Sequence, residues 1–245
     1  MSLSHIRRFL AIGGMVTLAP AIVMSSQPQP DQVTVTPVAR TEEGILARQA
    51  EVIRRARESA PASIVFIGDS ITEAWEGPGA AIWKERFALA GAVNLGVSGD
   101  RTEHVLWRLN QASLTRLEPK AVVILIGTNN LGHGTADAKA TLAGIRAVVA
   151  QIQKQVPQAR LLLCAIFPRG EGMNSMRGDV LQVNQALAVA VVGDPSIRLI
   201  DLGGKFVDAS GEISPTLMPD FLHLSPDGYR IWADGIQTPI AEALK

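Results

Sequence analysis

The sequence predicts an α/β protein, a three-layer α/β/α sandwich with a five-stranded parallel sheet. Short apolar, β-branched runs alternate along the chain with longer segments of helical periodicity. Residues 121–126 form the most apolar of these runs, as expected for a central strand that is buried on both faces. No internal repeat interrupts the alternation, so a single sheet covered by helices on both sides accounts for the pattern.

The elements follow in order. Strands are predicted at residues 63–67, 92–95, 121–126, 160–167 and 197–201, and helices at residues 41–60, 80–89, 100–114, 136–156, 175–192 and 225–244. The first helix has apolar residues on one face and stops at Pro61. The third helix opens with the acidic stretch from Asp100 to Glu103, which suits a helix N-terminus. The last helix carries Pro226 in its first turn, where proline is favoured.

The N-terminal segment has the order of an export signal. Arg7 and Arg8 precede an apolar run from Phe9 to Met24, and a polar, proline-rich stretch follows. We therefore expect residues 1–26 to be a signal peptide, residues 27–40 a linker, and residues 41–245 the folded domain. The expected location is periplasmic or secreted, without stable membrane insertion after cleavage. The alternative is an uncleaved N-terminal membrane anchor, although the run is shorter than the ~20 residues that a span needs.

Composition excludes several classes of partner. The chain of 245 residues has 23 Lys plus Arg and 23 Asp plus Glu, so it lacks the basic excess of a nucleic-acid-binding protein. Cys164 is the one cysteine, so no intrachain disulfide can form. No Cys/His cluster has metal-ligand spacing, and we expect neither a metal nor another cofactor. The sequence does not indicate an oligomeric state.

Polar residues follow the first three predicted strands. Ser70 comes after the first strand and the turn Gly68-Asp69, Gly99 after the second strand, and Asn129 after the third. Parallel α/β sheets bind ligands at the carboxyl ends of their strands, so these residues are expected at one edge. Each has an ordinary alternative when taken alone: a helix-capping serine, a turn glycine and a capping asparagine.

Near the C-terminus, Asp220 and His223 complete a nucleophilic constellation. A serine hydroxyl needs a base to take its proton, and histidine titrates near working pH. A carboxylate three residues earlier can bind the other ring nitrogen and fix the tautomer. Ser70, Asp220 and His223 are therefore the candidate catalytic residues. The backbone N–H groups of Ser70 and Gly99 and the Asn129 amide are candidate donors to an oxyanion.

These four blocks, in this order, resemble the SGNH superfamily of GDSL-type esterases and lipases. The similarity extends from about Ser63 to the C-terminus and is stronger to platelet-activating-factor acetylhydrolase catalytic subunits of the intracellular type and their bacterial relatives. The stretches that carry it are Asn94–Asp100, His104–Leu109, Ile126–Asn130, Pro168–Gly170 and Phe221–Ser225. The resemblance implies the flavodoxin-like SGNH hydrolase fold. It also implies an acyl-enzyme mechanism with Ser70 as nucleophile, Gly99 and Asn129 as oxyanion donors, and Asp220 with His223 as the final block. Ser98 departs from the glycine that is usual in those subunits.

The expected function is a serine esterase acting on a small-molecule ester, a short acyl group such as acetyl on a carbohydrate or similar polar alcohol. The alternatives are a lysophospholipase or thioesterase of the same superfamily, an acyltransferase that uses the same acyl-enzyme, and a non-catalytic carbohydrate-binding relative. Arg169 and Arg177, on the loop after the fourth strand, are either contacts for a polar leaving group or ordinary surface arginines.

Overall fold

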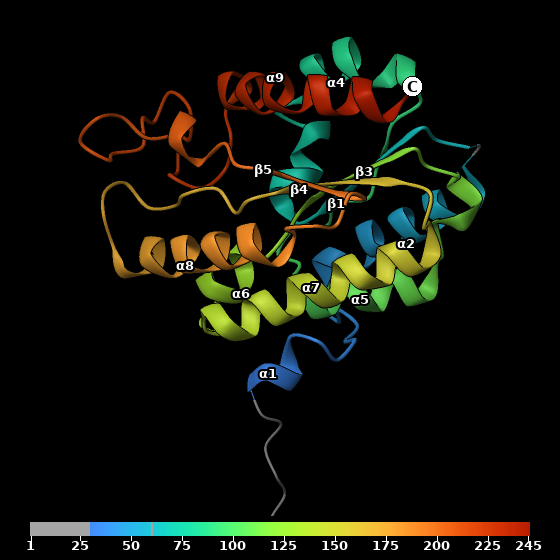
Figure 1. Cartoon of the computed structure of the whole chain (residues 1–245), viewed down its shortest axis with the longest axis horizontal. Coiled ribbons are helices and arrows are strands. Elements are labelled where there is room, and N and C mark those ends of the chain that lie inside the picture. Colours follow the sequence, from blue (N-terminus) through green and yellow to red (C-terminus); the bar gives the residue numbers. More distant parts are fainter. Residues whose placement is uncertain (1–29, 60) are drawn as a thin grey trace, which may run out of the picture.

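The computed structural model of the chain describes residues 30–59 and 61–245. The expected signal peptide or anchor, residues 1–26, lies outside the described residues. Five strands form one parallel sheet in the order β2-β1-β3-β4-β5, which confirms the predicted sheet (Figure 1). The strands are β1 Ile64–Gly68, β2 Val93–Asn94, β3 Ala121–Leu125, β4 Arg160–Cys164 and β5 Ile197–Ile200.

Helices cover both faces of the sheet (Figure 1). The longer helices are α2 Glu43–Glu58, α4 Ala80–Arg86, α5 Thr102–Gln111, α7 Ala138–Gln155, α8 Ser175–Ala190 and α9 Pro226–Ala243. The short ones are α1 Pro30–Val33, α3 Ser70–Glu73 and α6 Thr128–Gly132, with 3-10 turns at Ala74–Glu76 (η1), Ala88–Ala90 (η2), Leu114–Leu117 (η3) and Gly203–Lys205 (η4).

The two faces of the sheet belong to separate hydrophobic cores. Because side chains alternate along a strand, Val65 and Ile67 of β1 pack with α2, α5, α7 and α8, whereas Ile64 and Phe66 pack with α4 and α9. All five residues of β1 and of β3 are buried, which explains why their sequences are apolar throughout. The fold is the three-layer α/β/α sandwich that the sequence predicts.

Four strands are shorter than predicted, β3 and β5 by one residue each and β2 and β4 by more. β4 ends at Cys164 instead of residue 167 because a side chain replaces the next strand partner: Asn184 of α8 accepts from the Ile166 N–H at 2.9 Å and donates to the Ile166 carbonyl at 2.9 Å. β2, at the edge of the sheet, has two residues, although the N–H groups of Leu95 and Val97 still donate to the β1 carbonyls of Phe66, at 2.8 Å, and Gly68, at 3.2 Å. Both strands end early, and loops begin on the side where the polar motifs lie.

The segment expected as a linker, residues 27–40, contacts the rest of the chain over its described part. Helix α1 lies against α7 (Figure 1). Thr34 is buried, and its hydroxyl donates to the Ala140 carbonyl at 2.8 Å. The Val38 N–H donates to the Glu103 carbonyl at 3.1 Å. Composition alone suggested a linker, but these hydrogen bonds hold the segment against α5 and α7.

Candidate active site

The predicted site residues come together at the carboxyl edge of the sheet. Ser70 is the first residue of α3, directly after β1, and its Oγ lies 2.9 Å from Nε2 of His223. Asp69 caps α3 through Oδ1, which accepts from the Ile71 N–H at 3.0 Å. Among the described residues, the Ser70 N–H has no hydrogen-bond acceptor. A hydroxyl and a free N–H are therefore presented together at a helix N-terminus.

A buried tyrosine connects the Ser70 helix to the loop that carries His223. Tyr229 lies in the first turn of α9, shortly after His223, and its hydroxyl donates to the Ile71 carbonyl at 2.7 Å. Its ring also packs on Trp75, which follows α3, with ring centroids 4.5 Å apart. The Ser225 hydroxyl starts α9 by accepting from the Gly228 N–H. Ser70 and His223 are 153 residues apart in the sequence, and they meet because α9 is fixed against α3.

Asp220 organises the loop that ends in His223. Its Oδ1 accepts from the N–H groups of Leu222, at 3.1 Å, and His223, at 2.7 Å, while Oδ2 lies 2.6 Å from Nδ1 of His223. Phe221 makes the turn with φ 57°, a backbone conformation that is unusual for a side chain other than glycine. Burial acts to raise the pKa of Asp220, but the hydrogen bonds from His223 outweigh it, so the pKa lies below its ordinary value. An ionised Asp220 favours a proton on Nδ1 and leaves Nε2 to accept from Ser70.

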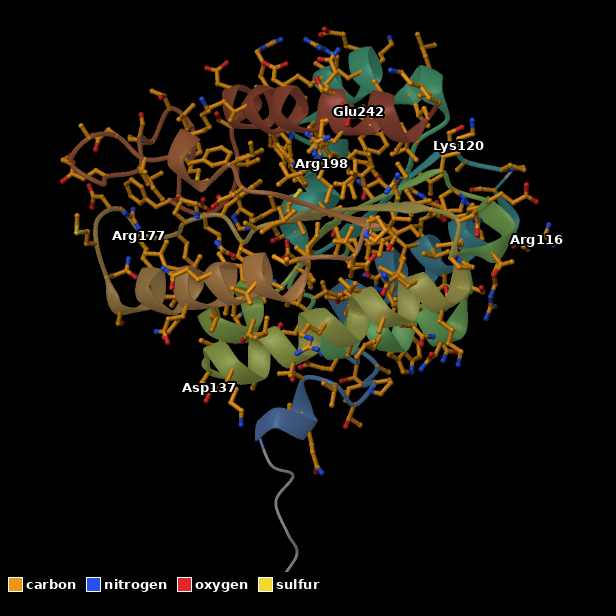
Figure 2. The ribbon with its side chains drawn as sticks, viewed as in Figure 1. Arg116, Lys120, Asp137, Arg177, Arg198 and Glu242 are labelled. Carbon is orange, nitrogen blue, oxygen red and sulfur yellow. The ribbon has the colours of Figure 1, made fainter. Side chains whose placement is uncertain are left out.

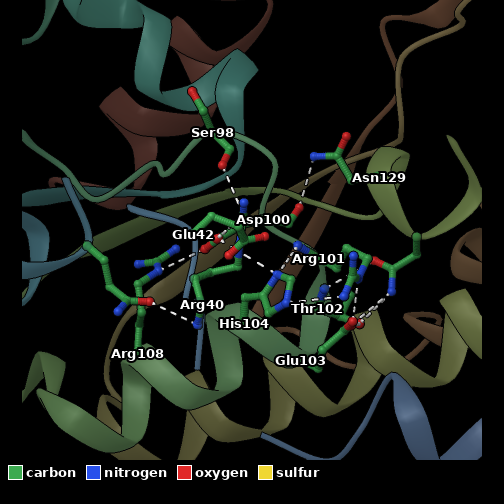
Figure 3. Close-up of polar contacts among 12 residues, drawn as sticks. Arg40, Glu42, Ser98, Asp100, Arg101, Thr102, Glu103, His104, Arg108 and Asn129 are labelled. Carbon is green, nitrogen blue, oxygen red and sulfur yellow. Dashed lines mark hydrogen bonds and ion pairs between the residues drawn. The ribbon is translucent and has the colours of Figure 1, made fainter. Parts of the chain in front are cut away.

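The candidate oxyanion donors Gly99 and Asn129 follow β2 and β3, the two strands that flank β1 and its Ser70. Gly99 has φ 74°, which suits glycine, and its N–H has no acceptor among the described residues. Asn129 is buried in α6, and one hydrogen of its side-chain amide donates to the Asp100 carbonyl at 3.0 Å (Figure 3). The second hydrogen of that amide stays available for a substrate oxygen. The structure thus places all three predicted donors at the same edge.

A buried ionic network lies under the Gly99 loop (Figure 3). The carboxylate of Asp100 accepts from Arg108 at 2.9 Å and from Arg40 at 3.3 Å. Burial raises the pKa of Asp100, whereas the two guanidinium groups act in the opposite direction. His104 is buried nearby, and its Nδ1 accepts from the Arg101 N–H at 3.0 Å. Burial lowers the pKa of His104 to about 4, so it is neutral at pH 7 and has a structural role.

Two depressions lie at the candidate site, one bordered by Ser70 and His223 and the other by the loop that carries Asp220. One, of about 460 Å³, is bordered by both residues and by Glu73, Glu76 and Ser98. The other, of about 300 Å³, is bordered by Asp220, Phe221, Leu222 and Arg169. The first contains the hydroxyl and the imidazole, so it offers the more direct approach for an ester.

Arg169 lies on the loop after β4, as expected, whereas Arg177 lies in the first turn of α8 beside that loop (Figure 2), and the two arginines differ in role. The Arg177 guanidinium donates to the carbonyls of Gly170 at 2.6 Å and Glu171 at 2.9 Å, which makes it a brace for the loop itself. Arg169 is half-buried and donates to the Thr128 carbonyl at 3.1 Å. Neither contacts Ser70 or His223 through a hydrogen bond, so a leaving-group role for them stays a prediction.

Sequence reasoning did not single out Arg40 or Glu73. Arg40 lies in a polar stretch without a motif, and Glu73 lies on the turn of helix after Ser70. The departure at Ser98 was the one available signal, because Ser98 is bonded to Glu73. Over the described ranges, no three His, Cys, Asp or Glu side chains are grouped as a metal site. None of the helices in residues 30–59 and 61–245 combines the length and the hydropathy of a membrane span.

Fold and site together define a class: an α/β/α hydrolase of ester substrates with its polar residues at the carboxyl edge of a parallel sheet. Within that class, the chain belongs to the GDSL-like Lipase/Acylhydrolase family, which matches residues 66–231. This family membership confirms the resemblance that the four sequence blocks indicate.

Relatives and solved structures agree with this assignment. The chain is 39% identical to human platelet-activating factor acetylhydrolase IB subunit alpha1 over 181 residues, covering 74% of this chain and 73% of the human one. It is 40% identical to the alpha2 subunit of Rattus norvegicus over 166 residues, covering 68% and 70%. A GDSL-like lipase from Bacteroides thetaiotaomicron superimposes with a TM-score of 0.66 at 21% identity, covering 80% and 99%. The acetylxylan esterase Axe2 of Geobacillus stearothermophilus superimposes with a TM-score of 0.58 at 18% identity, covering 74% and 94%.

Proposed function

We propose that this ester hydrolase is an exported serine esterase that removes short acyl groups, acetyl foremost, from a carbohydrate or similar polar alcohol. The observation that carries the proposal is the continuous line of hydrogen bonds from Ser70 Oγ through His223 to Asp220, 2.9 and 2.6 Å long, beside unoccupied N–H donors.

The reaction follows from this geometry. Ser70 Oγ attacks the ester carbonyl while His223 Nε2 takes its proton, and Asp220 stabilises the imidazolium. The charge that develops on the carbonyl oxygen is met by the N–H groups of Ser70 and Gly99 and by the Asn129 amide. The alcohol leaves with the proton from His223. Water then attacks the acyl group on Ser70 by the same steps and releases the acid.

The acyl group is proposed from the relatives. Proteins about 39–40% identical to this chain are named acetylhydrolases, and Axe2, which has the same fold, is named an acetylxylan esterase.

The alcohol is proposed from the larger depression. Glu73 Oε2 accepts from the Ser98 N–H at 2.6 Å and from the Ser98 hydroxyl at 2.8 Å, whereas its Oε1 lies 3.9 Å from the nearest arginine, Arg48. Glu73 therefore keeps a charged acceptor beside Ser70. Such an acceptor favours a leaving group rich in hydroxyls and repels a phosphate.

A substrate series that varies the acyl chain and the alcohol separately tests the proposal. We expect p-nitrophenyl acetate to be hydrolysed faster than the octanoate, and an acetylated methyl glycoside to be a substrate. Ser70→Ala abolishes both activities and labelling by a fluorophosphonate. Best rates at C8 or longer would instead identify a lysophospholipase or thioesterase, and an unlabelled Ser70 would indicate a carbohydrate-binding protein. Product partitioning to an added sugar would reveal acyl transfer.

A Glu73→Gln variant tests the alcohol side. We expect kcat/KM for the acetylated glycoside to fall at least about 10-fold more than kcat/KM for p-nitrophenyl acetate, since a charged hydrogen bond contributes ~1.5–3 kcal/mol. Glu76→Gln is the matched control, because Glu76 borders the same depression but is paired with Arg48 and Arg55. Equal losses on both substrates would reject a role for Glu73 in alcohol selection.

Export is proposed from the N-terminal sequence alone. Fractionation of cells that express the full chain tests it: the mature protein is expected outside the cytoplasm and shortened at its N-terminus. Recovery of the full-length chain in the membrane fraction would favour the uncleaved anchor.

A further inference from the structure

Arg40 precedes the family-matched residues 66–231 and lies in none of the four blocks. Its side chain is nevertheless only 9% exposed. Nη1 donates to the Ser98 carbonyl at 3.0 Å and to Asp100 Oδ1 at 3.3 Å, while Nε donates to both carboxylate oxygens of Glu42 at 3.0 and 2.9 Å. One guanidinium therefore joins the N-terminal segment to the loop that carries Gly99 (Figure 3).

The two loop contacts of Arg40 fall on either side of Gly99. A Cβ placed at Gly99 would lie 3.2 Å from Arg40 Nη1, which shows how closely the guanidinium approaches the loop. Because Ser98 and Asp100 are both held, the peptide between them has little freedom. The Arg40 guanidinium therefore fixes the orientation of the Gly99 N–H, a proposed oxyanion donor.

The same network reaches the second donor. Asp100 receives Arg40 on one side of its carboxylate and Arg108 on the other, and its carbonyl accepts from the Asn129 amide at 3.0 Å. Arg108 also donates to the Leu95 carbonyl at 3.0 Å, just after β2. Asp100 is thus the point where the Gly99 loop and the Asn129 side chain are fixed relative to the sheet.

The segment that delivers Arg40 is itself anchored. Thr34 is buried between α5 and α7, where its carbonyl accepts from the Thr102 hydroxyl at 2.9 Å. The Arg40 N–H faces the Gln49 side chain of α2 at 3.3 Å. The segment before α2 therefore holds the guanidinium in one position, as a preorganised site requires.

We propose that Arg40 is a positioning residue for the oxyanion donors of Gly99 and Asn129, and that residues 34–42 are a working part of the active site. The inference rests on the proposed serine-esterase mechanism. Catalysis by such donors depends on their being fixed before the reaction, and losing one donor costs roughly 10²–10³-fold in kcat. Loosening two donors without removing either is expected to cost less.

The test compares Arg40→Ala and Arg40→Lys with Arg57→Ala, in the full chain and with p-nitrophenyl acetate. Arg57 is a matched control because it also donates to a backbone carbonyl, that of Gln111, away from the site. We expect Arg40→Ala to lower kcat by at least about 10-fold with KM changed less than about two-fold. Arg40→Lys keeps the charge beside Asp100 and is expected to be intermediate, and Arg57→Ala to keep kcat.

Two further readouts separate positioning from stability. Guanidinium at tens of millimolar is expected to raise kcat of Arg40→Ala and not of wild type, and the loss of kcat is expected to persist well below the melting temperature. An Arg40→Ala enzyme with wild-type kcat below its melting temperature would overturn the inference. If Arg40→Ala cannot be purified, Arg40→Lys takes its place. A wild-type kcat in Arg40→Lys that guanidinium does not raise would also overturn the inference. Ser70→Ala is run in parallel: activity in that variant would mean that the proposed mechanism has failed rather than the role of Arg40.

Discussion

Asp69 is a buried carboxyl at the candidate site whose pKa differs strongly from that of an ordinary aspartate. It lies between Gly68 and the candidate nucleophile, fully buried. One carboxyl oxygen caps α3, and the other has no hydrogen-bond partner in the described chain. Burial, with a smaller contribution from the nearby Asp100, raises the pKa of Asp69 to about 7. A carboxyl with these surroundings is mostly neutral below pH 7.

This raised pKa has a defined sign for stability. Between the ordinary aspartate pKa near 4 and the folded value of about 7, the folded chain keeps a proton that the unfolded chain loses, so stability falls as pH rises. Asp69→Asn keeps an acceptor for Ile71 and removes the ionisation. We expect its melting temperature to gain on wild type by several degrees between pH 5 and pH 8. Asp234→Asn, at an exposed position of α9, is the control and should show no such gain. A constant difference at all pH values would contradict a raised pKa.

Single residues also mark what sequence can and cannot predict. Ser70, Gly99, Asn129, Asp220 and His223 were identifiable because each sits in a motif whose spacing has a chemical reason, and the structure brings them to one edge. Their catalytic roles stay predictions. Arg40 could not be found in this way, because the partners that connect it to the site are a backbone carbonyl and a carboxylate 58 and 60 residues away. Such contacts depend on the path of the whole chain and leave no local pattern.

At the scale of elements, the contact between α3 and α9 sets the distance between hydroxyl and imidazole. Tyr229 is fully buried, and its hydroxyl links the two helices by donating a hydrogen bond to the Ile71 carbonyl of α3. Tyr229→Phe keeps the ring on Trp75 and removes that bond. We expect it to lower the free energy of unfolding by about 1–2 kcal/mol and kcat by a few-fold, with KM little changed.

Denaturant unfolding and steady-state kinetics on one preparation check this. Asn110→Ala is a suitable control, because it removes an exposed hydrogen bond between α5 and α7, on the other face of the sheet from Tyr229. Full activity in Tyr229→Phe despite lost stability would mean that aromatic packing alone aligns the two elements.

Element boundaries show the same division between local and distant causes. The strands and helices were predictable within a few residues because periodicity reflects burial on one or two faces. The end of β4 was not, since it is decided by the Asn184 side chain, which takes over the backbone hydrogen bonds of Ile166. The short helix α6, which carries Asn129, has five residues and no periodic pattern to reveal it. The least predictable segments are therefore those that shape the site.

At the scale of the whole molecule, residues 30–59 and 61–245 form one sheet with a hydrophobic core on each side. Ile145 of α7 belongs to one core and Ile236 of α9 to the other, and both are fully buried. Because the sheet separates them, truncating both side chains should act on independent contacts while the shared strands keep unfolding cooperative. We expect Ile145→Ala and Ile236→Ala each to cost ~2–5 kcal/mol. The double variant should show their sum within about 0.5 kcal/mol, in a single transition by both fluorescence and circular dichroism. Two separated transitions would show that one face, with its share of the site, can unfold while the other remains.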